Sequence, residues 1–161
     1  ASFAVLLNFP RFNKMKGMGQ IVTWSVRDET LHTESAIKLF RTFVSENPEV
    51  LTPQLEKDIY QACETVISHE DAFINLAFEL GGVKGLEANQ VKDYIRFIAD
   101  LRLTQLGMEK IFNIKEHPLP WMVEMLGGVE HTNFFEGRAT EYSRASTKGS
   151  WDETFKDAFG T

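Results

Sequence analysis

Two residues of metal-binding type stand three positions apart in the segment 27–32, which reads RDETLH. If this segment is helical, Glu29 and His32 share one face, so that a carboxylate and an imidazole point into the same space. Carboxylate-bridged proteins that hold two iron or manganese ions place such a Glu-x-x-His pair on each of two helices and add single glutamates from two more. Glu29 and His32 are therefore candidate ligands that would supply half of a dinuclear metal centre.

The alternative is that the pair lies on an ordinary helix surface, because Glu-x-x-His also occurs by chance. Among the four histidines, only His32 has a glutamate three residues before it. Apolar neighbours such as Val26 and Leu31 favour the metal interpretation, since charges in apolar surroundings need partners that offset their desolvation. In the other polar cluster, His69-Glu70-Asp71, adjacent side chains face about 100° apart on a helix. We expect that cluster to be a solvated face.

Helices must position these residues, because apolar side chains recur every three or four positions over most of the chain. Thr52-Pro53 is typical of a helix start, and Gly81-Gly82 is typical of a stop. No alternation typical of strands is present, and the sequence predicts an all-α protein. The expected helices cover roughly residues 1–16 with a break near Pro10, 20–45 after a loosening at Gly17 and Gly19, 53–80, 87–109, and a short segment ending at Gly127.

The same periodicity predicts which side chains face inward. We expect Cys63 to be a small core residue, since a single cysteine cannot form an internal disulfide. The inward positions expected on the three long helices include Ile21, Trp24, Leu31, Ile37, Phe40, Val66, Ile67, Phe73, Val91, Tyr94, Ile95 and Leu101.

Size and charge exclude several classes of function. The 161 residues correspond to one domain, and 43% of them are hydrophobic, which suffices for a core. A net charge of −6 argues against nucleic acid or an anionic membrane as a partner, because both bind basic surfaces. No apolar run is long enough to span a bilayer. With its lone cysteine, the chain is expected to be cytoplasmic.

From residue 132 the chain becomes polar and loses its periodicity. We expect residues 1–131 to form the helical domain and residues 132–161 to form a mobile tail. Tyr142 is an aromatic residue within this polar stretch. Trp151, Phe155 and Phe159 repeat every four residues and would form one stripe if helical, which favours a segment that docks in the groove of a partner.

Four segments in order resemble the radical-generating small (β) subunit of class I ribonucleotide reductase. They are ASFAVLLNF at 1–9, VRDETLH at 26–32, NFFE at 133–136 and ATEY at 139–142. The resemblance runs along essentially the whole chain and matches the C-terminal half of that subunit. It implies part of a ferritin-like helical bundle whose dinuclear metal centre (Fe/Fe, Mn/Fe or Mn/Mn) activates dioxygen and stores an oxidising equivalent. The large subunit uses that equivalent to reduce ribonucleotides to deoxyribonucleotides.

The resemblance also implies residue roles. Glu29 and His32 match the second Glu-x-x-His and would bind one metal, and Phe3 matches an apolar wall near the radical site. Asp28 matches the acidic residue that hydrogen-bonds a ligand histidine and takes part in radical transfer. Tyr142 matches the tyrosine that relays the radical towards the large subunit. The final residues, with Trp151, Phe155 and Phe159, match the segment that docks there.

In the family, the first Glu-x-x-His, the remaining acidic ligands and the radical tyrosine would precede Ala1. We therefore expect the chain to be active only with a polypeptide that supplies the N-terminal half of the small subunit, and with the large subunit. Complete small subunits are expected to dimerise. Two alternatives stay open: another ferritin-like di-metal oxidase, and a non-catalytic helical interaction module.

Overall fold

The computed structural model of the chain describes residues 1–127, and every regular element in that part is a helix. The predicted all-α class is confirmed. Val83 and Leu86 form an isolated bridge but no strand. None of the helices within 1–127 combines the length and apolar composition that a bilayer crossing requires. The elements are α1 (Ser2–Arg11), α2 (Lys16–Glu46), the short 3₁₀ helix η1 (Pro48–Val50), α3 (Pro53–Phe78), α4 (Ala88–Leu106) and α5 (Pro120–Gly127).

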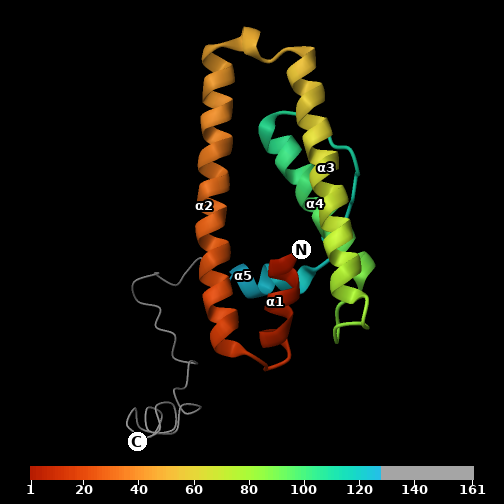
Figure 1. Cartoon of the computed structure of the whole chain (residues 1–161). Coiled ribbons are helices and arrows are strands. Elements are labelled where there is room, and N and C mark those ends of the chain that lie inside the picture. Colours follow the sequence, from red (N-terminus) through yellow and green to blue (C-terminus); the bar gives the residue numbers. More distant parts are fainter. Residues whose placement is uncertain (128–161) are drawn as a thin grey trace, which may run out of the picture.

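The two longest helices form the sides of a frame. Figure 1 shows α2 and α3 on opposite sides, joined at one end through η1, with α1 and α5 lying between them at the other end. α4 runs along α3, and α1 packs against α2. With 31 residues, α2 extends over roughly 46 Å at a rise of about 1.5 Å per residue.

The predicted helix start at Thr52-Pro53 is confirmed. The Thr52 hydroxyl oxygen accepts the N–H of Leu55 at 3.2 Å, and Pro53 occupies the first helical position, where its missing N–H costs nothing. At the start of α4, the Gln90 side chain accepts the N–H of Glu87 at 3.2 Å. These local contacts satisfy N–H groups that have no partner within the helix.

The corner between α1 and α2 differs from the prediction. The expected break near Pro10 is present, since α1 ends one residue later, but residues 12–15 are not helical. Gly17 and Gly19 lie inside α2, where they do not loosen the chain. Gly19 is buried, and a Cβ atom placed on it would lie 2.5 Å from Cγ of Pro10. The absence of a side chain at Gly19 therefore allows α1 and α2 to pack closely.

The hydrophobic core lies where α1 and α5 meet the longer helices. Its buried residues come from every α-helix and from the loops before α4 and α5, so that the short helices join the sides of the frame. Phe3, predicted as an apolar wall residue, is half-buried and packs against this cluster. The buried members are Ala4, Leu7, Val22, Ile74, Leu86, Val91, Leu119 and Met122.

Several residues predicted to face inward are exposed instead. Ile21, Leu31 and Val66 are 53%, 56% and 57% exposed, and Cys63 is only half-buried. Helical periodicity identifies the apolar face of a helix, but burial needs a neighbour on that face. No part of residues 1–127 covers these positions. Further large apolar side chains that stand exposed on α2, α3 and α4 are Leu39, Phe43, Phe73, Leu76 and Leu101.

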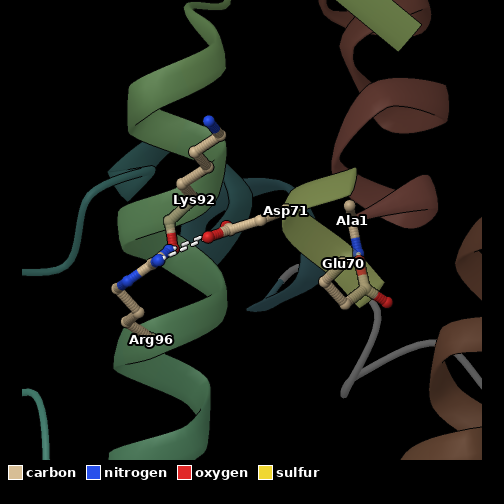
Figure 2. A network of polar contacts seen from close by, with 5 residues as sticks. All are labelled: Ala1, Glu70, Asp71, Lys92 and Arg96. Atoms are coloured by element: carbon tan, nitrogen blue, oxygen red, sulfur yellow. Dashed lines mark hydrogen bonds and ion pairs between the residues drawn. The ribbon is translucent and has the colours of Figure 1, made fainter. Parts of the chain in front are cut away.

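The expectation of a solvated face at His69-Glu70-Asp71 is wrong for its two acidic residues. Figure 2 shows Asp71 on α3 facing Arg96 on α4, and the two form a bidentate ion pair with N–O distances of 2.9 and 2.6 Å. Glu70 lies 2.8 Å from the amino nitrogen of Ala1, whereas His69 is exposed. Charge-assisted bidentate pairs hold both partners in fixed geometry, so Asp71 and Arg96 link α3 to α4.

Replacing Asp71 with Asn should lower the free energy of unfolding by about 1 kcal/mol at neutral pH, since the pair is only partly buried. The hydrogen bond from Arg96 holds the pKa of Asp71 below its usual value of 3.8. The contribution of the Asp71–Arg96 pair to the free energy of unfolding is therefore complete above about pH 4, and it is lost as the pH falls through the lowered pKa of Asp71. Urea unfolding as a function of pH measures this. Glu34→Gln, at an exposed position on α2, is the control, and equal losses in both variants would contradict the prediction.

Candidate metal centre

The candidate ligands lie near the middle of α2. His32 Nδ1 is 3.7 Å from Glu29 Oε2, and His32 Nε2 is 3.9 Å from Asp28 Oδ1. The predicted sharing of one face by Glu29 and His32 is confirmed, because residues three apart on a helix are neighbours. Each ring nitrogen of His32 thus has a different carboxylate beside it.

These three side chains are open to solvent, with 68%, 60% and 66% of Asp28, Glu29 and His32 exposed. Apolar sequence neighbours therefore do not desolvate these side chains within residues 1–127, and the expectation that they do is wrong there. Helix geometry alone brings the three groups together.

The donor types suit a transition metal, but their number is small. A carboxylate oxygen and an imidazole nitrogen each bind such ions at about 2 Å, so two donors on one ion lie within about 4 Å of each other. The 3.7 Å separation between Glu29 and His32 satisfies this limit. Within residues 1–127, no group of three or more His, Cys, Asp or Glu side chains is arranged to hold a metal ion. The pair fits as part of a ligand set.

Two hollows flank the candidate ligands along α2. The larger, of about 510 Å³, has Asp28 in its wall together with Ile21, Trp24, Ser25, Arg27 and Leu31. The second, of about 280 Å³, lies where Leu126 of α5 approaches α2. Both are walled mainly by α2, so the helix presents a partly apolar, hollowed surface next to Asp28.

The other predicted site residues lie on other parts of the chain. Phe3 lies in α1 and packs against the core cluster, which Val26 of α2, three residues before Glu29, also contacts. Tyr142, Trp151, Phe155 and Phe159 lie outside the described residues, as does the predicted boundary at residues 131 and 132.

Sequence reasoning missed the role of His117. Its ring packs between Tyr94 and Phe97, with centroid distances of 5.5 and 4.9 Å, and its Nδ1 accepts the N–H of Leu119 at 3.1 Å. Burial lowers the pKa of His117, which keeps the ring in the neutral form that this hydrogen bond requires. The only signal in the sequence was the rigid turn at His117-Pro118.

Asp100 is the buried carboxylate of the described fold, and its position was also missed. It is 3% exposed, and Oδ1 accepts the N–H groups of Ile111 and Phe112 at 2.9 and 3.0 Å. Burial, with Asp100 nearby, raises the pKa of the Cys63 thiol. Asp100 therefore fastens the loop after α4, and the raised pKa of Cys63 disfavours the thiolate form.

Comparison with known proteins identifies related chains. Residues 1–118 match the family model described as "Ribonucleotide reductase, small chain". A probable ribonucleoside-diphosphate reductase small subunit of Invertebrate iridescent virus 3 is 44% identical over 152 residues, covering 94% of this chain and 40% of the viral protein. The ribonucleoside-diphosphate reductase subunit beta of Chlamydia pneumoniae is 36% identical, covering 94% of this chain and 43% of the bacterial one. The chain thus spans less than half the length of these relatives.

Solved structures give the same picture of the fold. The crystal structure of a putative class I ribonucleotide reductase from Bacillus halodurans superposes with a TM-score of 0.70 at 28% identity, covering 74% of this chain and 38% of that one. The R2 subunit of a ribonucleotide reductase from Clostridium botulinum gives a TM-score of 0.73 at 23% identity, covering 77% and 39%. The helical frame of Figure 1 is the arrangement that these proteins share.

Proposed function

The chain belongs to the ribonucleotide reductase small-chain family, and on that premise we propose that it forms part of the small subunit of a class I ribonucleoside-diphosphate reductase. The observation that carries the proposal is the Glu29–His32 pair, exposed on α2 with its donors 3.7 Å apart. Two donors are too few to hold a dinuclear centre, and residues 1–127 contain no group of three or more candidate ligands. The pair therefore suits a ligand set to which other parts of a subunit also contribute.

In this proposal Glu29 and His32 are two ligands of a dinuclear centre of iron, manganese or both. Carboxylate and neutral imidazole suit either metal. When bound, the centre supplies the oxidising equivalent used for ribonucleotide reduction. Glu29 and His32 hold one ion, and Asp28 lies beside the other ring nitrogen of His32, 3.9 Å away. A carboxylate that closes from there to hydrogen-bond distance would fix the tautomer and orientation of the ligand ring. Phe3 would help to exclude water.

The large subunit is the partner that would receive the oxidising equivalent. Tyr142 is proposed to relay it, and the stripe formed by Trp151, Phe155 and Phe159 is proposed to dock on the large subunit. An aromatic residue every four positions presents one apolar face if the segment becomes helical on binding.

The rest of a small-chain sequence, which we name the complementary segment, would supply the other ligands, whether it lies on the same polypeptide or on another. The exposed apolar side chains of α2 and α3 support this, since they lie on the apolar faces of their helices and no part of residues 1–127 covers them. So does the length of the relatives, of which this chain spans 40% and 43%. Complete small subunits would then form dimers.

Metal analysis of the 161-residue chain, alone and mixed with the complementary segment, tests the proposal. We expect less than one bound Fe or Mn per chain alone and two per complex, together with reductase activity when the large subunit is added. A chain that binds both ions unaided would refute the shared ligand set. A complex that binds metal and oxidises other substrates but never supports the large subunit would favour a ferritin-like oxidase.

Deletion of residues 132–161 should abolish binding to the large subunit while leaving the metal content unchanged. The physical reason is that the relay and docking residues lie in that segment, whereas Glu29 and His32 lie on α2. Sedimentation or calorimetry of the complex with the large subunit measures the loss. A triple alanine variant at Trp151, Phe155 and Phe159 separates the docking side chains from the rest of the segment, and unchanged affinity in both variants would contradict the docking role.

A further inference from the structure

A cavity of about 170 Å³ lies between the end of α1 and the loop before α4. It is distant from the candidate metal ligands, since α2 begins at Lys16 and thirteen residues of helix, roughly 20 Å, separate that point from Glu29. Aromatic, aliphatic and amide groups are combined with two lysines in its wall. The residues are Asn8, Phe9, Phe12, Lys14, Val83 and Lys84.

The floor of the cavity is held rigidly. Asn8 is 2% exposed, and its Nδ2 donates to the carbonyl oxygen of Lys84 at 2.9 Å. Arg11 donates to the carbonyl oxygen of Gly85 at 2.9 Å. Gly85 has φ +71°, and a Cβ atom on it would lie 2.5 Å from Cζ of Phe12. These contacts fix the loop against α1, so the cavity is formed before any ligand arrives.

The cavity is basic although the chain is acidic overall. Residues 1–27 contain no Asp or Glu, and both Lys14 and Lys84 are exposed. Lys84 Nζ lies 4.9 Å from the centroid of the Phe12 ring. Within residues 1–127, neither lysine amine forms an ion pair with a carboxylate. Two ammonium groups therefore border one small cavity, and neither is paired with a carboxylate of residues 1–127.

We propose that this cavity binds a small aromatic phosphate. Its volume suits one ring, because a cavity of about 150 Å³ lined by apolar side chains holds a benzene molecule. Phe9, Phe12 and Val83 provide apolar contact for the ring. A phosphate monoester carries about −1.5 to −2 charges. This charge matches the two positive charges of Lys14 and Lys84 more closely than the single negative charge of a carboxylate would.

Calorimetric titration of the full 161-residue chain with phenyl phosphate at low salt tests the proposal. We expect phenyl phosphate to bind more tightly than either inorganic phosphate or phenol, because the site uses both ring and charge. Lys14→Gln and Lys84→Gln should each weaken binding by about tenfold. Lys38→Gln, at an exposed position on α2, should leave it unchanged. Equal weakening by Lys38→Gln would overturn the proposal, and so would inorganic phosphate binding as tightly as phenyl phosphate.

A second variant tests the cavity itself without changing any charge. Val83→Phe should fill the space for the ring and reduce the affinity for phenyl phosphate at least tenfold, while weak binding of inorganic phosphate persists. Circular dichroism verifies that each variant remains helical. Undiminished phenyl phosphate binding by Val83→Phe would place the ligand elsewhere and refute the assignment. This experiment measures binding of phenyl phosphate, whereas the small-subunit proposal is tested by metal content. Either proposal can therefore fail without the other.

Discussion

Alanine at Glu29 or at His32 is expected to weaken binding of one of the two metal ions in the assembled small subunit roughly 100-fold or more, with a matching loss of reductase activity. Each substitution removes one donor from an ion that has few protein donors on this chain. The fold should survive, because the two side chains are 60% and 66% exposed on α2 and surface substitutions change stability little. Metal analysis and activity of the purified complex measure both effects.

Matched controls separate a ligand role from a general change in charge. His69→Ala removes an exposed histidine from α3, and Glu34→Ala removes an exposed carboxylate from α2. Neither should change the metal content. Asp28→Asn should retain the metal more fully than Glu29→Ala, because its carboxylate acts through His32. Unchanged metal in the Glu29 and His32 variants would favour the non-catalytic helical module.

The helices were predictable because their causes are local. Thr52 and Pro53 start α3 through contacts that span three residues, and Gly107 ends α4 with φ +87°, a conformation that glycine adopts without strain. The proximity of Glu29 to His32 is equally local. Such features depend on nearest neighbours along the chain, so the sequence contains all the information needed to place them.

Contacts between distant segments could not be placed in the same way. Asp71 and Arg96 are 25 residues apart, and nothing near either residue indicates that α3 and α4 will bring them together. The sequence around Gly19 predicts a loosened chain, although the role of Gly19 depends on Pro10, which packs against it from the other side of a turn. For the same reason, His117 could not be assigned its aromatic neighbours on α4. Tertiary packing decides the role of each of these residues.

Burial is mispredicted for several apolar residues, which are exposed although the helical period places them inside. Leu31 and Val66 were expected inside but are 56% and 57% exposed. Both residues lie on the apolar faces of their helices, and residues 1–127 provide no partner that packs against them there. The complementary segment would cover such positions. Substitutions at the exposed apolar residues of α2 and α3 should therefore weaken assembly, whereas substitutions in the core should lower the free energy of unfolding.

Two alanine substitutions on α3 should therefore have opposite dependence on assembly. Ile74 is fully buried and Leu76, two residues later, is 69% exposed. In the chain alone, Ile74→Ala should lower the free energy of unfolding by about 2–5 kcal/mol, because it opens a cavity in the core. Leu76→Ala should change it by less than about 0.5 kcal/mol. Urea unfolding followed by circular dichroism measures both.

With the complementary segment bound, Leu76→Ala should become costly, because its side chain would then be removed from a packed interface. We expect the affinity of the chain for the complementary segment to fall by roughly tenfold or more, as for truncation of a buried apolar contact worth over about 1.4 kcal/mol. Gln61→Ala, at an exposed polar position of α3, is the control for a change of surface alone. If Leu76→Ala leaves the affinity unchanged, the complementary segment does not cover this face of α3, and its exposed apolar surface requires a different partner.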